Sequence, residues 1–161
     1  MNKLQNGLQG VKSRIVQAAR SAGRDPRDIL LVAVSKTFPT SAIELAYAAG
    51  QHDFGESYVQ EALAKMGALA AHSITWHFIG PIQSNKTRVL AERFQWVHSV
   101  DRLKVAERLS AQRPSGMPPL NVCIQVNTSG EASKSGCPPA EVLELARSMA
   151  RLPRIALRGL M

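Results

Sequence analysis

Short apolar runs alternate with segments of helical periodicity along the whole chain, and this alternation constrains the fold more than any other feature. The runs predict six strands, at residues 29–35, 52–56, 74–79, 96–100, 120–126 and 155–161. The run 29–35 is almost continuously apolar, which is typical of a strand buried on both faces of a parallel sheet. A regular alternation of strands and helices predicts an α/β protein, either doubly wound or closed into a barrel.

The intervening segments predict a leading helix that ends at Gly23 and five helices between the strands. We expect these five helices at 39–50, 57–70, 84–94, 101–111 and 138–152. Ser41 and Glu44 have the spacing of a capping box, and Asp101 is a candidate N-cap. No Gly-x-Gly-x-x-Gly follows any of the strands, so the dinucleotide-binding version of the α/β fold has no support.

The chain length bears on the choice between the two α/β architectures. A closed (β/α)₈ barrel typically needs about 250 residues, and this chain has 161. We therefore expect residues 1–161 to form a single domain that holds six of the eight βα units, incomplete at its carboxyl end. Unpaired edge strands and the apolar residues Val32, Val34, Leu157 and Leu160 would then favour self-association.

Charge and cysteine content exclude several function classes. The net charge of +8 is spread over the predicted helices, with no run of five like charges and no basic–aromatic interleaving, so we expect no nucleic-acid partner. No apolar run approaches the roughly 18 residues of a membrane span, and residues 1–6 lack a signal-peptide core. Cys123 and Cys137 alone cannot build a disulfide framework or a four-ligand zinc site. These features predict a cytoplasmic protein without a membrane or metal partner.

Lys36 is the strongest candidate for chemistry. It directly follows the first predicted strand, at the carboxyl end where parallel α/β sheets and barrels place their functional groups. A lysine partly withdrawn from water becomes a nucleophile toward carbonyl compounds. A strand-end lysine that only reaches solvent is the alternative on position alone.

Six ordered motifs resemble the pyridoxal phosphate homeostasis protein family. They are Leu30 to Thr37, Phe54 to Glu61 (FGESYVQE), Trp76 to Lys86 (WHFIGPIQSNK), His98 to Asp101, Asn127 to Gly136, and Leu157 to Met161. The resemblance implies a TIM-type barrel related to the N-terminal domain of alanine racemases. It also implies pyridoxal 5'-phosphate as cofactor, held as a Schiff base on Lys36.

The same resemblance suggests further cofactor-binding residues. Ser57 would hydrogen-bond the ring oxygen, although many relatives carry Asn there and a helix cap is an equal alternative. His77 would face the cofactor or serve as a core histidine, and Met161 would pack against the cofactor or belong to the core. Polar residues that could line the barrel mouth, or only cap helices and face solvent, are Gln83, Asn85, Lys86 and Lys134.

The resemblance implies a binding protein in vitamin B6 homeostasis that carries the cofactor without turnover and hands it to apoenzymes. Related racemases add a second β-domain and an acid/base residue opposite the lysine, and we expect neither here. The segments that resemble the family's phosphate-binding site are also missing from residues 1–161, so we expect weaker binding of the cofactor. The alternatives are a racemase- or decarboxylase-like enzyme and a Schiff-base aldolase, the latter on topology alone.

Overall fold

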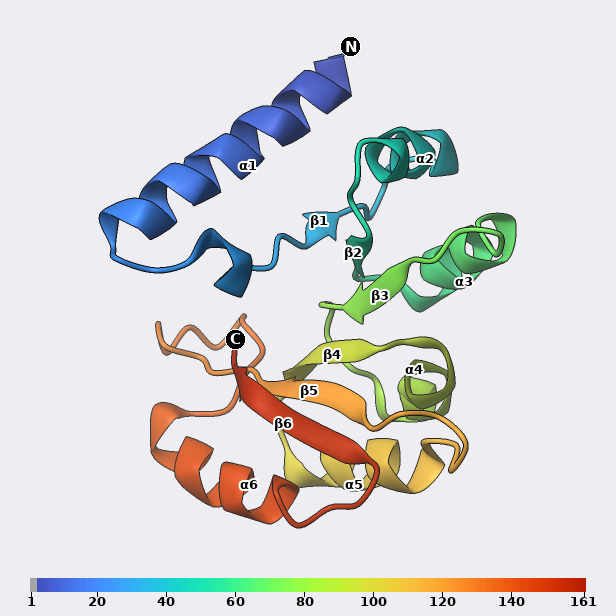
Figure 1. Cartoon of the computed structure of the whole chain (residues 1–161). Helices are drawn as coiled ribbons and strands as arrows, with labels where there is room; N and C mark the ends of the chain where they lie inside the picture. Colours follow the sequence, from blue (N-terminus) through green and yellow to red (C-terminus); the bar gives the residue numbers. More distant parts are fainter. Residues whose placement is uncertain (1–2) are drawn as a thin grey trace.

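Six parallel strands form one sheet in the order β1-β2-β3-β4-β5-β6 in this computed structural model, which describes residues 3–161 (Figure 1). Residues 1–2 of the amino-terminal segment considered above lie outside the described part. The strands are β1 Ala33–Val34, β2 Asp53–Glu56, β3 Thr75–Phe78, β4 Trp96–Val100, β5 Leu120–Ile124 and β6 Ile155–Leu160. The helices are α1 Lys3–Ser21, α2 Thr40–Ala48, α3 Val59–Ala68, α4 Thr87–Arg93, α5 Leu103–Gln112 and α6 Val142–Met149. Short 3₁₀ turns η1 Pro26–Asp28, η2 Ser84–Lys86 and η3 Pro139–Glu141 complete the order.

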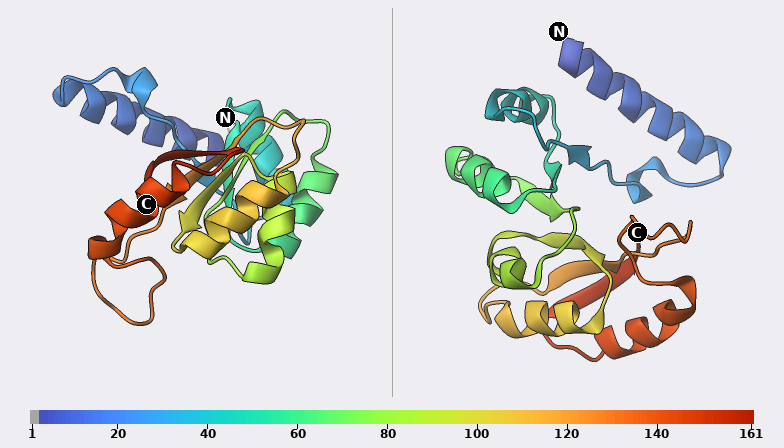
Figure 2. Two further views of the ribbon diagram at one scale, coloured as in Figure 1. Left: turned by 90° about the horizontal axis from the view of Figure 1, so that it is seen from below. Right: turned by 180° about the vertical axis from the view of Figure 1, so that it is seen from behind.

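The sequential strand order confirms the predicted α/β class and sets where the helices lie. Right-handed crossovers between neighbouring parallel strands put every connecting helix on the same side of the sheet. The helices α2 to α6 accordingly follow the outer side of a curved sheet in Figures 1 and 2. The strands β1 and β6 are its two edges, as the six predicted strands require.

The two faces of the sheet have different compositions. Phe54, Trp76 and Phe78 are buried beneath the helices, and the Phe78 ring meets Phe94 edge-on at 5.4 Å between centroids. The neighbouring positions Asp53, Gly55 and His77 alternate with them and so face the other way. The helix-covered face therefore holds the apolar core, and the opposite face carries polar groups.

The first strand is much shorter than the predicted 29–35. Its only partner is β2, which begins at Asp53, and the register pairs Ala33 with Phe54 and Val34 with Gly55. By the same register Val32 lies level with Asp53, the first residue of β2, so residues 29–31 have no β2 residue beside them and form no strand.

Two predicted helix caps are wrong. The helix α2 begins at Thr40 with Pro39 at its N-cap, so Ser41 lies inside the first turn and the capping box does not form. Arg102, not Asp101, is the N-cap residue of α5. Asp101 instead accepts hydrogen bonds from the Arg102 guanidinium at 2.7 Å and the Gly136 N–H at 3.4 Å.

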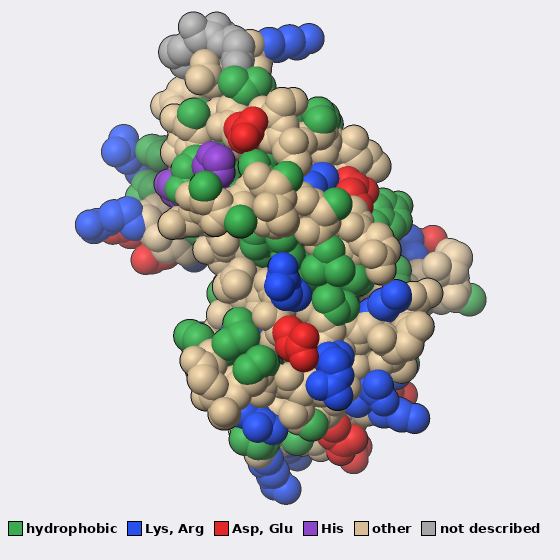
Figure 3. All heavy atoms as spheres, turned by 90° about the vertical axis from the view of Figure 1, so that its right-hand side faces the viewer, with side chains coloured by type: hydrophobic (Ala, Val, Ile, Leu, Met, Phe, Trp, Pro, Cys, Tyr) green, Lys and Arg blue, Asp and Glu red, His purple; other side chains and the backbone are tan. Residues whose placement is uncertain are grey.

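The surface carries both signs of charge. In the view of Figure 3, Lys and Arg side chains are interspersed with Asp and Glu. No helix within residues 3–161 combines the length and the apolar character needed to cross a membrane.

A buried arginine after α5 binds the segments that lead into β4 and β5. Arg113 is 2 % exposed, and its guanidinium donates to the carbonyls of Ala91 at 2.7 Å, Phe94 at 2.8 Å and Pro118 at 2.8 Å.

We expect Arg113→Met to lower the free energy of unfolding by about 3 kcal/mol, because buried carbonyls would lose their donors. Urea unfolding checks this, with the exposed Arg93→Met as control. Equal midpoints for the two variants would show that the guanidinium does not stabilise this region.

Candidate functional site at the carboxyl end of the first strand

Lys36 lies in a tight turn directly after β1. The Phe38 N–H donates to the Ser35 carbonyl at 3.1 Å, so Lys36 and Thr37 are the two central residues of a four-residue turn. Ser35 still pairs with β2, donating its N–H to the Gly55 carbonyl at 2.9 Å. The Lys36 side chain is exposed, and its amine has no hydrogen bond or ion pair with residues 3–161. The expectation that Lys36 is partly withdrawn from water is therefore wrong for these residues, and the amine is instead accessible from solvent.

The backbone of Thr37 is strained. Its φ of 68° lies in the left-handed region, which the third position of such a turn normally fills with Gly or Asn. A β-branched side chain makes this conformation costlier, by about 1–3 kcal/mol in total. Something in the surrounding structure must hold Thr37 in this conformation.

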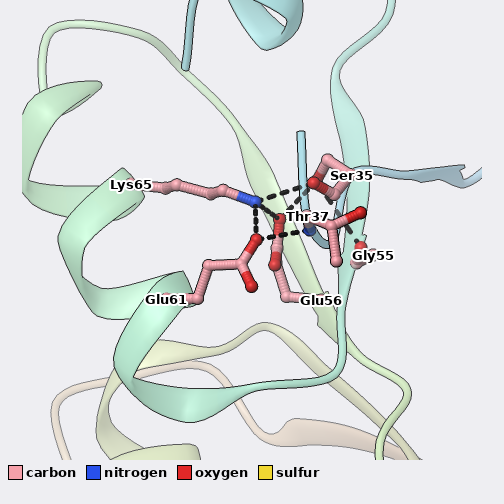
Figure 4. Close-up of polar contacts among 6 residues, drawn as sticks. All are labelled: Ser35, Thr37, Gly55, Glu56, Glu61 and Lys65. Atoms are coloured by element: carbon pink, nitrogen blue, oxygen red, sulfur yellow. Dashed lines mark hydrogen bonds and ion pairs between the residues drawn. The ribbon is translucent and has the colours of Figure 1, made fainter. Parts of the chain in front are cut away.

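A buried charged cluster supplies that restraint (Figure 4). Lys65 of α3 is 5 % exposed, and its Nζ contacts Glu56 Oε1 at 2.8 Å and Glu61 Oε1 at 2.5 Å. The same Nζ donates to the Ser35 carbonyl at 2.7 Å, and Glu61 Oε1 accepts the Thr37 N–H at 2.5 Å. The peptide groups on both sides of Lys36 therefore bind one cluster, and the clamp is defined here as Glu56, Glu61 and Lys65.

The clamp contains two carboxyl groups and one amine, and Lys65 Nζ contacts one oxygen of each carboxyl group. Glu56 is fully buried; its Oε1 also accepts the Ser35 hydroxyl at 2.6 Å, and its Oε2 has no partner among the described residues. The hydrogen bond from Lys65 is the largest influence on the pKa of Glu61 and lowers it, and the Thr37 N–H acts in the same direction. Glu61 is therefore ionised at neutral pH.

The sequence reasoning missed the clamp. Lys65 is one of only two basic residues in 31–85, and it stands four residues after Glu61, which is the spacing of a helical ion pair. This spacing could have indicated the Glu61–Lys65 contact. Nothing in the sequence shows that both residues turn inward to the end of β1.

Of the other predicted residues, Ser57 lies nearest to Lys36 in the sheet. The register that pairs Val34 with Gly55 places Lys36 and Ser57 at the same level, each just beyond its strand. Tyr58, not Ser57, is the N-cap of α3, so the predicted capping role is wrong. Gly80 packs against the Ser57 backbone, and a Cβ on Gly80 would approach Ser57 Cα to 2.8 Å. The half-buried Ser57 is thus held beside Lys36.

His77 lies deeper, on the polar face of the sheet. It is 1 % exposed, its Nε2 lies 2.9 Å from Asp53 Oδ1, and its Nδ1 lies 2.9 Å from His98 Nε2. The ring also stacks on Trp96 at 5.5 Å. Because an ionised Asp53 can only accept, a neutral His77 carries its proton on Nε2 and accepts from His98 through Nδ1. Both ring nitrogens of His77 are thus already engaged by Asp53 and His98.

Met161 lies far from Lys36 in strand order. Its N–H donates to the Ile124 carbonyl at 2.8 Å and extends the pairing of β6 with β5, at the opposite edge of the sheet from β1. The side chain is 47 % exposed. Sheet hydrogen bonding therefore does not bring Met161 to Lys36.

The remaining polar candidates lie around the carboxyl ends of other strands. The 3₁₀ turn η2 contains Asn85 and Lys86 and has Gln83 as its N-cap, while Lys134 pairs with Glu131 at 2.9 Å in the loop after β5. That loop projects from the sheet (Figure 2). A hollow of about 290 Å³ lies between this loop and the end of β3, lined in part by Ile79, Asn127 and Lys134.

Comparison with known proteins identifies the family. Residues 8–161 match the family model described as alanine racemase, N-terminal domain. The chain is 60 % identical over 161 residues to the pyridoxal phosphate homeostasis protein of Pseudomonas aeruginosa, covering 100 % of this chain and 70 % of that protein. The chain belongs to the pyridoxal phosphate homeostasis protein family. The Escherichia coli K12 member is 53 % identical, with the same two coverages.

Solved structures agree with this assignment. PipY of Synechococcus elongatus, in a structure with PLP bound, is 38 % identical with a TM-score of 0.78, covering 93 % of this chain and 69 % of PipY. Alanine racemase of Clostridium difficile is 13 % identical with a TM-score of 0.65, covering 83 % of this chain and 35 % of the racemase. At that identity the racemase shows the fold alone, and its barrel domain agrees with the predicted barrel relationship.

The buried histidines generate a pH prediction. Burial is the largest influence on the pKa of His77 and lowers it, partly offset by the Asp53 carboxylate; burial, and then His77, lower the pKa of His98. Because the pKa of each histidine in the folded state lies below its ordinary value of about 6.5, the unfolded chain binds more protons below that pH, and stability falls as pH falls. Each histidine changes the free energy of unfolding by at most about 1.4 kcal/mol per pH unit.

We expect His77→Gln to flatten this dependence between about pH 7.5 and 5.5, measured as urea-unfolding free energy. The exposed His52→Gln is the matched control and should leave the slope as in the original chain. A His77→Gln slope equal to the control would mean that His77 is not held neutral by burial.

Proposed function

We propose that this chain binds pyridoxal 5'-phosphate as a Schiff base on Lys36 and serves in vitamin B6 homeostasis without turning over a substrate. The observation that carries the proposal is the unpartnered Lys36 amine at the carboxyl end of β1, in a chain 60 % identical to a pyridoxal phosphate homeostasis protein. The structure of PipY, 38 % identical, is described with PLP bound.

The residues around Lys36 fit an aldehyde with a flat ring. The absence of a side chain at Gly55 lets Ile79 and Val32 pack over the sheet below Lys36, since a Cβ there would meet Ile79 Cδ1 at 3.2 Å and Val32 Cγ1 at 3.3 Å. Beside it, the half-buried Ser57 offers a hydroxyl that can hydrogen-bond a ring oxygen. One primary amine and one hydroxyl therefore lie at the same level of neighbouring strands, above apolar side chains.

The cofactor, when bound, supplies an electrophilic aldehyde. Lys36 would hold the cofactor covalently through its amine, with one water released on attachment and taken up again on release. Ser57 orients the ring. His77 supports the sheet below the site through Asp53 and Trp96, and Met161 would provide an apolar contact from the far side of the barrel mouth.

The carrier role is proposed over catalysis because proton abstraction needs a base placed on one face of the cofactor. His77, one of two neutral candidates, is fully buried and bonded at both ring nitrogens. Tyr58, the other candidate, is 57 % exposed at the start of α3. Neither side chain is held in a position suited to remove a proton from a substrate.

Release of the cofactor to apoenzymes in the cytoplasm is part of the same proposal. An exposed amine in an exposed turn allows water to reach the linkage, so the aldehyde can leave again. We propose residues 1–161 as one cofactor-binding domain.

The test is reduction of the complex with borohydride followed by peptide mass mapping. Pyridoxal phosphate should become attached to Lys36 in the original chain, and Lys36→Ala should abolish both the attachment and the visible absorbance band. Lys104→Ala, on the exposed side of α5, is the control and should behave as the original chain.

Absorbance that survives in Lys36→Ala would overturn the assignment of Lys36. Trapping of sugar phosphates but not of pyridoxal phosphate would select the aldolase alternative. Turnover of amino acids, lost on changing His77 or Tyr58, would select a racemase- or decarboxylase-like enzyme.

A further inference from the structure

The clamp contacts the chain on both sides of Lys36 and not Lys36 itself. Lys65 Nζ donates to the carbonyl of Ser35, and Glu61 accepts the N–H of Thr37. We propose that Glu56, Glu61 and Lys65 are positioning residues that set the affinity of Lys36 for the aldehyde by holding its turn in a strained, binding-competent conformation. This inference rests on the proposed function, since it concerns the lysine assigned there.

The clamp joins three elements at one point (Figure 4). Glu56 comes from the end of β2, while Glu61 and Lys65 lie one helical turn apart on α3. Glu56 Oε1 accepts from both Lys65 Nζ and the Ser35 hydroxyl. A displacement of α3 or β2 is therefore transmitted to the turn, and the turn cannot move without breaking a buried contact.

Thr37 shows why the turn needs this support. At a φ of 68° it adopts a conformation that residues other than Gly, Asn and Asp rarely take. If the bond to Glu61 is lost, Thr37 can relax to a negative φ, which rotates the peptide that carries Lys36. The apparent dissociation constant for pyridoxal phosphate then equals the intrinsic constant divided by the fraction of molecules whose turn keeps the binding-competent conformation. The free-energy cost of a left-handed backbone at one residue corresponds to a factor of about ten in that dissociation constant.

A purely structural role for the clamp makes a different prediction. In that case its loss lowers stability but leaves the affinity of the folded protein for pyridoxal phosphate unchanged. Arg113→Met is the matched control because Arg113 is also a buried cation that donates to backbone carbonyls, on segments around β4 and β5. It should lower stability and leave the affinity unchanged.

The experiment titrates the full chain with pyridoxal phosphate and follows the absorbance of the Schiff base, with thermal unfolding recorded for each variant. Glu61→Ala should raise the dissociation constant about tenfold. Glu61→Gln keeps an oxygen that can accept the Thr37 N–H, so it should recover most of that loss. Lys65→Met provides a second disruption and should weaken binding in the same direction if it folds.

A double-variant cycle isolates the strained turn. Thr37→Gly removes the Cβ that makes the left-handed conformation costly. In that background, Glu61→Ala should weaken binding much less than it does beside Thr37. Equal effects in both backgrounds would show that Glu61 does not act by restraining Thr37.

The outcomes separate this inference from the function on which it rests. If the original chain forms no Schiff base, or Lys36→Ala binds equally well, the proposed function fails. If Lys36 binds the aldehyde and folded Glu61→Ala binds it with the original affinity, only the positioning role fails.

Discussion

The ion pairs of Lys65 with Glu56 and Glu61 are the interactions on which the site depends. The Lys65–Glu56 pair is buried, and removing one partner from such a pair costs about 3–5 kcal/mol, whereas Glu61 is 30 % exposed and its pair contributes less. The arrangement is therefore difficult to relax, although well-packed apolar residues can often replace such pairs without loss of stability. These ion pairs matter here because Lys65 Nζ and the Glu61 carboxylate also bind the peptide groups on either side of Lys36 and so fix the position of its turn.

The two faces of the sheet have different roles, because one packs into the apolar core and the other carries the polar groups near the site. Its helix-covered face buries Phe54, Trp76 and Phe78, and this apolar face gives the strands their register. The opposite face carries Asp53, His77 and His98 in one hydrogen-bonded chain. Polar groups on that face lie below Lys36 without interrupting the core, so the site can bind a ligand while the fold keeps its apolar packing.

Sequence patterns predicted the six strands and five intervening helices because period and turn residues are local properties. The predicted bounds of β4, 96–100, are those of the structure. The caps at Ser41 and Asp101 failed because side-chain capping depends on where the first helical turn begins, and neighbouring segments decide that. Lys36 was found from its place after an apolar run. The clamp was not, since the inward orientation of Lys65 depends on the packing of α3 against β2.

The most direct test of the account is a crystal structure of the chain grown with pyridoxal phosphate. The account predicts continuous electron density from Lys36 Nζ to the cofactor, with Thr37 still at positive φ and its N–H still bonded to Glu61. Cofactor density attached to any of the other six lysines, or held without a bond to Lys36, would contradict it.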